Sequence, residues 1–227
     1  MLPQSKGKMF LADERGLNEM AWFRTYNTFN FGRYYNEHKT PFGSLYVLNE
    51  DILAGGKGFN MLVEEPTDII LLPVVGAISF KNTEGHNGII EAGQVQLLHM
   101  QKGTQLEIRN PYESDLVKFL QLWIKMPAIE ETTPVSASFT LDNHLREIFN
   151  REGCHRGAIV KLASKEEAVY KLSNPENGVF VFAIEGDMEA QYRLLYAGDG
   201  LALWEVEEVE IEALSASAIV LIVEVSL

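Results

Sequence analysis

The residue types best suited to binding a transition metal are five histidines and one cysteine, spread over 227 residues. Histidine ligands often share one strand or helix, where they are spaced as His-x-His or His-x-x-x-His. No histidine here has a second histidine at either spacing, so their positions predict no metal site of their own. They are His38, His86, His99, His144 and His155.

Two groups of residues could take part in nucleophilic catalysis. Cys154 stands directly before His155, but adjacent side chains often point apart, which favours a loop or core thiol over a catalytic one. Asp142, His144 and Glu147 lie close together in sequence, but no serine or cysteine nucleophile accompanies them. Neither group predicts a catalytic site.

Two further segments admit a functional or a structural interpretation. The cluster Gly55-Gly56-Lys57-Gly58 lacks the Gly-Lys-Ser/Thr ending of a phosphate-binding loop, and no helical pattern follows it, so a barrel corner is favoured. Residues 204–212 alternate acidic with branched apolar side chains, which is typical of strands with one solvated face. A surface for cations or basic proteins is the alternative.

Short β-strands must position these residues. Residues 69–75 form an almost continuous apolar run that is typical of a buried strand, with Pro73 at an edge or a bulge. Residues 105–109 alternate polar and apolar side chains. Regular short strands separated by glycine turns predict an antiparallel sandwich or barrel. Further strands are predicted at 44–49, 116–124, 158–162, 179–184, 191–195, 201–205 and 218–225.

Residues 9–51 are rich in aromatic side chains, whose usual role is to pack against a sheet rather than to stack on a cofactor. Within this segment, the strand at 44–49 is expected to be followed by Asn49-Glu50-Asp51 and then the glycine turn.

One helix is predicted over residues 141–149. Its apolar residues fall at positions i, i+4, i+7 and i+8, Thr140 or Asp142 can cap it, and Gly153 can end it.

Composition restricts the partners. Asp and Glu number 32 against 19 Lys and Arg, so the net charge of −13 argues against nucleic acid as a partner. No segment has the length and apolar character of a signal peptide or membrane span, which predicts no membrane partner. A single cysteine rules out an intramolecular disulfide and agrees with a reducing compartment. We therefore expect a cytoplasmic protein.

A long ordered set of residues in the first half of the chain resembles the pirin family, bicupin proteins that include enzymes similar to quercetin 2,3-dioxygenase. The set comprises Arg15-Gly16, Trp22, Thr28-Phe29-Asn30-Phe31, Tyr34-Tyr35, Phe42-Gly43, Leu45, Val47, Asn49-Glu50-Asp51 and Gly56-x-Gly58-Phe59.

The resemblance continues through 180–186, 197–200 and 218–225. It implies an all-β bicupin of two antiparallel β-barrel (jelly-roll, double-stranded β-helix) domains. The expected division is an N-terminal cupin at 1–127, a linker and helix at 128–157, and a smaller C-terminal cupin at 158–227.

The resemblance also implies where a metal would lie, because family members hold an iron-type metal with three histidines and one glutamate in the N-terminal barrel. The first metal-binding motif of cupin barrels is framed here by Gly56, Asp68 and Gly76. Aligned on that frame, the two histidine positions of the motif hold Leu62 and Glu64.

The second motif is anchored on Gly103 and on Asn110-Pro111, and it places the remaining histidine and glutamate at Leu106 and Ile108. Leucine and isoleucine have no lone pairs, and one remaining carboxylate cannot hold a transition metal alone. The resemblance and the residues together predict that the metal ligands are replaced and that the protein has no metal cofactor.

Glu64 is the anomaly in this set, because an inward carboxylate among apolar side chains is costly without a partner. The hypothesis is that Glu64 pairs with a buried donor or faces a wetter pocket, and the alternative is a surface glutamate. Asp68 and His99 are further candidates for polar pocket residues.

These residues favour a degenerate, metal-free pirin-like protein that binds a small apolar or aromatic ligand, or a protein partner, with no established catalytic residue. The alternative is a quercetin 2,3-dioxygenase-like, metal-dependent oxygenase with a shifted site around Glu64, Asp68 and His99. Metal-independent catalysis in a residual pocket is a third alternative.

Overall fold

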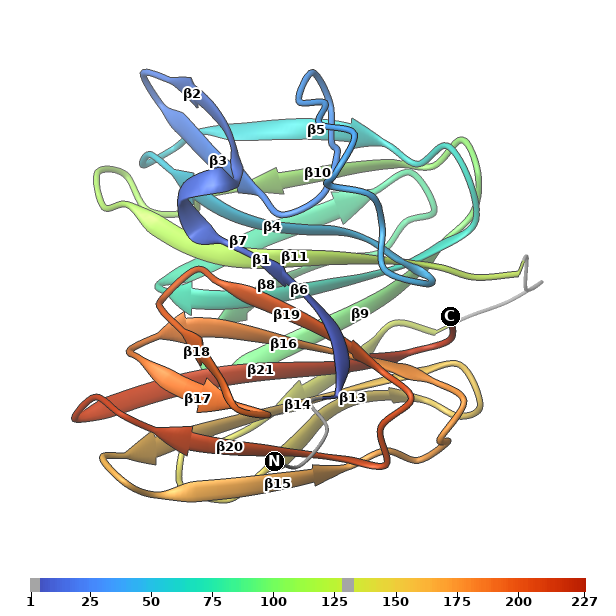
Figure 1. The fold of residues 1–227 in the computed structure, drawn as a ribbon. Coiled ribbons are helices and arrows are strands. Elements are labelled where there is room, and N and C mark those ends of the chain that lie inside the picture. The colour runs from blue at the N-terminus through green and yellow to red at the C-terminus, as the bar shows by residue number, and fades with distance from the viewer. Residues whose placement is uncertain (1–4, 128–132) are drawn as a thin grey trace. The chain divides into compact units, whose positions relative to one another are not determined.

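The computed structural model describes residues 5–127 and 133–227, and β-strands make up most of this part (Figure 1). The described residues form 21 strands in four sheets, and their strand pairings are antiparallel. A single 3-10 turn at Ala12–Glu14 is their only helical element, and none of their helices is long or apolar enough to cross a membrane. The all-β class predicted from the sequence is confirmed.

The chain folds as two compact units. The first unit consists of Gly16–Pro41 and Leu45–Ser138, and the second of Met1–Arg15, Phe42–Ser44 and Phe139–Leu227, as far as these segments are described. The second unit is therefore assembled from three separate pieces of chain. Each unit contains one larger and one smaller sheet.

The first unit contains a seven-stranded sheet with the order β12-β9-β6-β11-β4-β3-β2 and a four-stranded sheet with the order β5-β10-β7-β8. Its strands are β2 (Gly16–Met20), β3 (Phe23–Asn27), β4 (Leu45–Leu53), β5 (Gly58–Leu62), β6 (Thr67–Val75), β7 (Ala77–Asn82), β8 (Asn87–Glu91), β9 (Gln94–Met100), β10 (Gln105–Arg109), β11 (Val117–Lys125) and β12 (Val135–Ser138).

The core of the first unit is built from alternate residues of these strands. Ile69 and Leu71 of β6 belong to one apolar cluster with Leu106 and Ile108 of β10, and all four side chains are fully buried. Because successive side chains of a strand point to opposite faces, these residues define the inner face of each strand. Burying each one contributes roughly 1.5–3 kcal/mol.

Pro73 lies in a central strand, where its missing N–H would interrupt the ladder. The pairing of β6 with β11 shifts register between Lys118 and Phe119, which faces Pro73, so an irregularity accommodates the proline. Of the two predicted alternatives, a sheet edge or a bulge, the irregularity at Pro73 agrees with the bulge.

The second unit contains a six-stranded sheet with the order β1-β19-β16-β21-β14-β13 and a four-stranded sheet with the order β15-β20-β17-β18. Its strands are β1 (Lys6–Phe10), β13 (Arg146–Arg151), β14 (His155–Ala163), β15 (Glu167–Lys171), β16 (Gly178–Glu185), β17 (Met188–Ala190), β18 (Arg193–Leu195), β19 (Gly200–Trp204), β20 (Glu208–Ala213) and β21 (Ser217–Val225).

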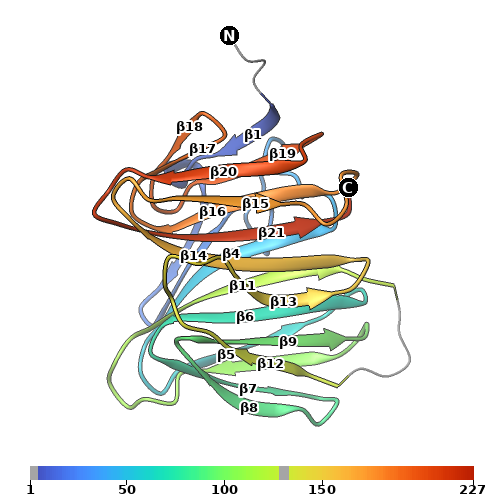
Figure 2. The ribbon, with the colours of Figure 1, turned by 90° about the horizontal axis from the view of Figure 1, so that it is seen from below.

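Strand β1 joins this sheet from the other end of the chain. It lies antiparallel to β19, with Met9 opposite Leu201 (Figure 2). Gly7 permits the close approach, because a Cβ atom there would lie 2.7 Å from the Ala202 carbonyl oxygen. A second piece joins at Ser44, whose N–H donates to the Ser226 carbonyl oxygen at 2.9 Å.

The prediction of a helix over residues 141–149 is wrong. Residues 142–144 form a bend between irregular residues, and β13 occupies the rest of that segment. The register of β13 on β14 shifts between Glu147 and Phe149, and this irregularity buries the consecutive residues Ile148 and Phe149. Because Ile148 and Phe149 are adjacent and both buried, they match positions i+7 and i+8 of a helical pattern although they lie in a strand. Asp142, the expected cap, instead accepts from the N–H of His144 at 3.0 Å in a local turn.

The strand predicted at 191–195 is also only half right. Gln191 and Tyr192 have positive φ angles of 45° and 62° and form the two-residue turn between β17 and β18. Only Arg193–Leu195 is extended.

Candidate functional site

Two of the four predicted ligand positions lie inside the N-terminal barrel. Leu106 and Ile108 are 0% exposed and lie opposite Met61 and Phe59 of β5. All four residues belong to the core cluster or pack against it. The inner face at this place therefore presents hydrocarbon.

The other two positions face away from that core. Val63 is fully buried in the cluster, and side-chain alternation places its neighbours Leu62 and Glu64 on the opposite side. Leu62 is 55% exposed and Glu64 is exposed as well. An inward Glu64 that pairs with a buried donor is therefore wrong. Glu64 is exposed and lines a surface cavity, which agrees with the other arm of the hypothesis, a wetter pocket.

Leu62 and Glu64 instead line a surface cavity of about 480 Å³, together with Tyr46 and Trp123. The Tyr46 hydroxyl lies 2.7 Å from Thr67 Oγ1. Burial raises the pKa of Tyr46 to about 12, so this hydroxyl stays protonated at neutral pH. The cavity offers hydrogen-bonding groups, and Glu64 is exposed at its edge.

Asp68 and His99 contact one another. His99 Nδ1 lies 2.7 Å from Asp68 Oδ1, and both side chains are fully buried. Their neighbours Ile69 and Leu98 point into the barrel core, so this pair points to the opposite face of the sheet. The structure therefore brings the two candidates together, but away from Leu106 and Ile108.

A larger cavity, of about 570 Å³, lies beside the core and is called the aromatic pocket below. Its apolar lining comes from the β2–β3 hairpin, the loop after β3, and β5. The ring centroids of Phe23 and Phe59 are 4.8 Å apart. A volume of this size holds a drug-sized molecule. The aromatic and thioether side chains of the lining are Trp22, Phe23, Phe31, Phe59, Met20 and Met61.

Three polar residues, Thr25, Asp51 and Gln121, form the floor of the aromatic pocket, and none is more than 4% exposed. Trp123 Nε1 donates to Gln121 Oε1 at 2.8 Å, and Gln121 Nε2 donates to Asp51 Oδ2. An indole N–H can only donate, so the side-chain oxygen of Gln121 must face Trp123. The NH₂ group of Gln121 therefore faces Asp51. The Asp51 carboxyl group is thereby held at the floor.

Two buried amides continue this polar row across the inner face of the sheet. Asn49 pairs in register with Asn27 on one side and Gln121 on the other. Within 5–127 and 133–227, neither the Nδ2 nor the Oδ1 atom of Asn49 has a hydrogen-bond partner, and Asn27 Nδ2 also lacks one. Buried polar groups of this kind need a water or a ligand group as partner.

The sequence interpretation missed this floor. It ended a strand at Asn49, whereas β4 continues through Asp51 to Leu53. The overlooked signal is a period of two, since Thr25 and Asn27 on one strand and Asn49 and Asp51 on the next put polar groups on the same inner face.

Comparison with known families shows what this chain is similar to. Residues 11–124 match the family model described as Pirin. The chain belongs to the pirin family. Residues 156–225 of this pirin match a second model, the quercetinase C-terminal cupin domain. The predicted family is confirmed.

Relatives match over nearly the whole length of this pirin. Quercetin 2,3-dioxygenase of Escherichia coli K12 is 25% identical over 225 residues, which cover 92% of this chain and 95% of that protein. The crystal structure of bacterial pirin YhhW from Escherichia coli in complex with nickel(II) has a TM-score of 0.86 at 22% identity, covering 97% and 99% of the two chains.

Quercetin 2,3-dioxygenase from Acinetobacter baumannii has a TM-score of 0.73 at 16% identity, covering 96% of this pirin and 85% of that chain. These structural likenesses show a shared fold, and the predicted bicupin architecture is confirmed.

The residues at the predicted ligand positions do not fit the metal that the family resemblance implies. A transition metal needs several imidazole, thiolate or carboxylate donors that converge at about 2 Å. Leu106 and Ile108 offer none, and Glu64 is exposed. The described residues contain no cluster of three or more His, Cys, Asp or Glu side chains that could hold a metal ion.

The weaker clusters noted in the sequence make the following contacts. His155 is buried, with its ring 5.8 Å from that of Phe149, and Cys154 is a free, partly buried thiol. Arg146 pairs with Asp142 at 2.6 Å, and Arg156 pairs with Glu147. Each acid of the Asp142, His144 and Glu147 group thus has an arginine partner.

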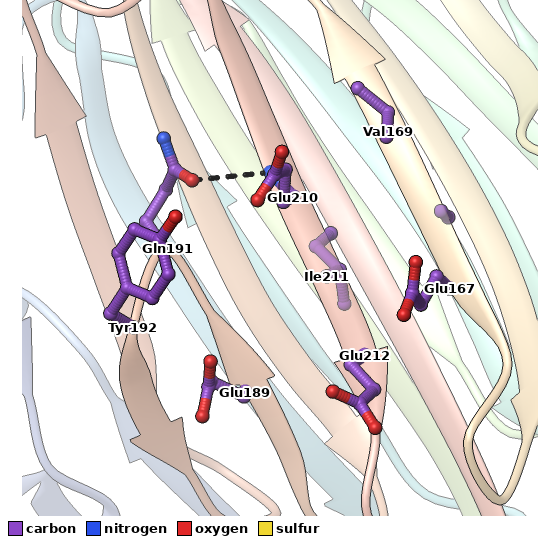
Figure 3. Close-up of a pocket in the computed structure, with 9 residues that line it drawn as sticks. Glu167, Val169, Glu189, Gln191, Tyr192, Glu210, Ile211 and Glu212 are labelled. Atoms are coloured by element: carbon purple, nitrogen blue, oxygen red, sulfur yellow. Dashed lines mark hydrogen bonds between the residues drawn. The ribbon is translucent and has the colours of Figure 1, made fainter. Parts of the chain in front are cut away.

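An acidic face covers the smaller sheet of the second unit (Figure 3). Glu212 of β20 lies directly opposite Glu167 of β15 and Glu189 of β17, beside a cavity of about 240 Å³. Val209 and Ile211 alternate with the acidic residues along β20, and both are buried. The predicted alternation along β20 is confirmed. Because like charges lie directly opposite each other on neighbouring strands, they weaken the pairing of those strands.

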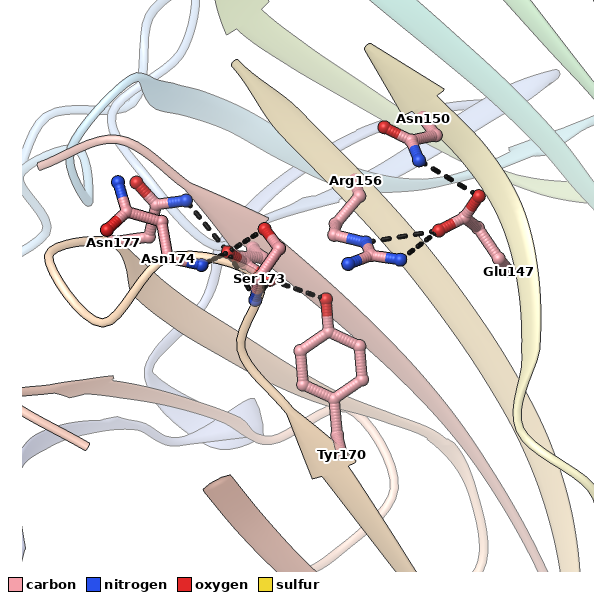
Figure 4. Close-up of polar contacts among 8 residues, drawn as sticks. Glu147, Asn150, Arg156, Tyr170, Ser173, Asn174 and Asn177 are labelled. Atoms are coloured by element: carbon pink, nitrogen blue, oxygen red, sulfur yellow. Dashed lines mark hydrogen bonds and ion pairs between the residues drawn. The ribbon is translucent and has the colours of Figure 1, made fainter. Parts of the chain in front are cut away.

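Glu224 is a fully buried carboxylate. Its hydrogen-bond donors belong to β15 and the turn after it, and they are Tyr170, Ser173, Asn174 and Asn177 (Figure 4). It accepts hydrogen bonds from Tyr170 Oη at 2.8 Å, Ser173 Oγ at 2.6 Å, and Asn177 Nδ2 at 2.8 Å, and from the N–H groups of Ser173 and Asn174. Burial raises the pKa of Glu224, but the hydrogen bonds outweigh burial and hold it below its ordinary value. Its ionised form therefore stabilises the folded second unit.

We expect the Glu224→Gln variant to lose about 1–3 kcal/mol of unfolding free energy at pH 7, because its amide NH₂ would face donors. Since folding lowers the pKa of Glu224, the wild-type advantage is complete above the unfolded-state pKa and disappears as pH falls through the folded-state pKa. Urea unfolding from pH 7 to pH 3 tests this. The exposed Glu208→Gln is the control, and an equal loss at every pH would contradict the prediction.

Proposed function

We propose that this member of the pirin family binds a small, largely apolar molecule in the aromatic pocket, without a transition metal at the ligand positions of the family. The observation that carries the proposal is the combination of hydrocarbon at Leu106 and Ile108 with a nearby cavity of about 570 Å³. Ligand sites typically combine an apolar lining with a few fixed polar groups, as Asp51 and Gln121 provide here. We also propose a cytoplasmic location, on the grounds of the single cysteine.

The oxygenase alternative is not favoured, because its shifted site does not assemble. Glu64 is exposed, whereas Asp68 and His99 form a buried pair on the other face of the sheet. These three side chains therefore do not converge on one point.

Metal content tests the metal-free part of the proposal. After purification without affinity metals, we expect substoichiometric iron, nickel, copper and zinc, and the same melting temperature with and without a chelator. A stoichiometric metal whose removal lowers the melting temperature would contradict the proposal.

A pocket-filling variant tests ligand binding. Met61→Trp places a bulky ring where the aromatic pocket lies, so the affinity for the neutral fluorescent probe N-phenyl-1-naphthylamine is expected to fall at least about tenfold, or ~1.4 kcal/mol. Titration of probe fluorescence measures the change.

Ile89→Trp is the matched control, because Ile89 is 64% exposed on β8 and lines neither cavity of the first unit described above. Its affinity for the probe should equal that of the wild type. Thermal unfolding confirms that both variants are folded. Equal probe binding by folded Met61→Trp would place the ligand site elsewhere.

A further inference from the structure

The two cavities of the first unit described above have one wall in common. The cavity of about 480 Å³ beside Tyr46, called the Tyr46 cavity below, and the aromatic pocket of about 570 Å³ are both lined by Phe31, Gly32 and Met61. We propose, on the basis of the ligand site proposed above, that the two cavities are halves of one elongated hollow, which the Phe31 side chain divides. Phe31 thereby limits the ligand to a compact ring system and excludes long, rigid molecules.

The strands show that the two cavities follow one another along the same face of the sheet. On β11, Trp123 lines the Tyr46 cavity and Gln121 lines the aromatic pocket. These residues are two positions apart, so their side chains point to the same face and their Cα atoms are roughly 7 Å apart. On β4, Val47 and Asp51 line the two cavities in the same way, with Asn49 between them on that face. The common wall therefore lies where the two spaces meet.

Phe31 and Met61 reach this wall from different elements. Phe31 belongs to the loop after β3, and its ring lies edge-on to that of Trp123, with centroids 6.0 Å apart. Met61 belongs to β5 in the four-stranded sheet. Both side chains are partly buried and pack against the core cluster of the first unit. Because side chains in a core are closely packed, the Phe31 ring leaves no passage for a second ring beside it.

A short loop, rather than a sheet, holds Phe31 in place. Its carbonyl oxygen accepts from the Tyr34 N–H at 3.0 Å, in an isolated bridge. Gly32 follows with a φ angle of 57°, a conformation that glycine adopts readily. Removal of the Phe31 ring therefore breaks no pairing between strands of the two sheets, so the role of the ring can be tested separately from the fold.

Two neutral fluorescent probes of different shape test the proposal. N-phenyl-1-naphthylamine is compact, whereas 1,6-diphenyl-1,3,5-hexatriene is a stiff rod with a phenyl ring at each end. Fluorescence titration of the full wild-type chain is expected to show that the rod binds at least about tenfold more weakly than the compact probe, because its second ring stays in water.

The variant Phe31→Ala is expected to open the wall. The rod should then bind at least about tenfold more tightly than to the wild type, because its second ring becomes buried. The compact probe loses a ring that lines its pocket, so its affinity should stay the same or fall. A purely structural role of Phe31 would instead weaken the binding of both probes. Met61→Ala removes the other side chain of the wall and should also strengthen the binding of the rod.

Tyr35→Ala is the matched control. Tyr35 lies on the same loop, is 79% exposed, and is not among the described residues that line either cavity. Its affinities for both probes should stay within about threefold of the wild type. Thermal unfolding verifies that all three variants are folded.

Binding of the rod to the wild type as tightly as the compact probe would overturn the dividing role of Phe31 and leave the aromatic pocket as the ligand site. Unchanged binding of the rod by folded Phe31→Ala or folded Met61→Ala would overturn it in the same way. Failure of both probes to bind the wild type and the variants would overturn this inference together with the proposed function.

Discussion

A single Ile108→Glu substitution, which restores the carboxylate of the family at that position, is expected to destabilise the first unit by at least about 3 kcal/mol at pH 7. Ile108 is fully buried between Phe59 of β5 and Phe80 of β7 in the four-stranded sheet. An ionised carboxylate there would have neither water nor a charged partner. Equilibrium unfolding in urea measures the loss.

Because burial raises the pKa of a carboxyl group, the glutamate at 108 should accept a proton in the folded state at a higher pH than in the unfolded state. The destabilisation is therefore complete above the folded-state pKa and decreases as pH falls through it. Leu62→Glu is the control, because Leu62 is 55% exposed and the change should stay within about 0.5 kcal/mol. Equal tolerance of both substitutions would contradict the inward orientation of Ile108.

The second large effect concerns engineered metal binding. In the double variant Met61→His/Leu106→His, the two imidazoles would stand directly opposite each other on the inner face, where Cβ atoms of paired residues lie about 4.5–5.5 Å apart. Such a pair can share one nickel(II) ion. We therefore expect nickel to raise the melting temperature of this variant and to bind roughly a hundredfold more tightly than to the wild type.

The matched variant Leu62→His/Leu106→His contains two of the three histidines that the family motifs would predict. Leu62 and Leu106 point to opposite faces of the sheet, so its nickel affinity and melting temperature in nickel should match those of the single Leu106→His variant. Tight nickel binding by this second pair would show that β5 is displaced by one residue from the described register.

The sequence could predict those parts of the fold that depend on local signals. Glycine turns and β-branched runs indicated most strands, and the bulge that accommodates Pro73 follows from its missing N–H. The resemblance to pirins identified the family, and its second motif pointed to Leu106 and Ile108, which the structure buries in the core of the first unit.

Other features depend on pairing between distant strands, which local patterns do not specify. Leu62 and Glu64 face outward because Phe59 and Met61 occupy the inner face of β5, and a shift of one residue exchanges the two faces. The floor of the aromatic pocket was missed for a related reason, since Asp51 looks like a turn residue until its strand partner is known.

The pairing of β1 with β19 also affects how the protein is made. Lys6 emerges from the ribosome long before Trp204, its partner in the ladder, is synthesised. All eleven strands of the first unit are synthesised between β1 and β19. That unit can therefore fold during translation while β1 is still unpaired. Until β1 docks, β19 is an open sheet edge that can pair with another chain. Aggregation of nascent or truncated chains should therefore centre on β19.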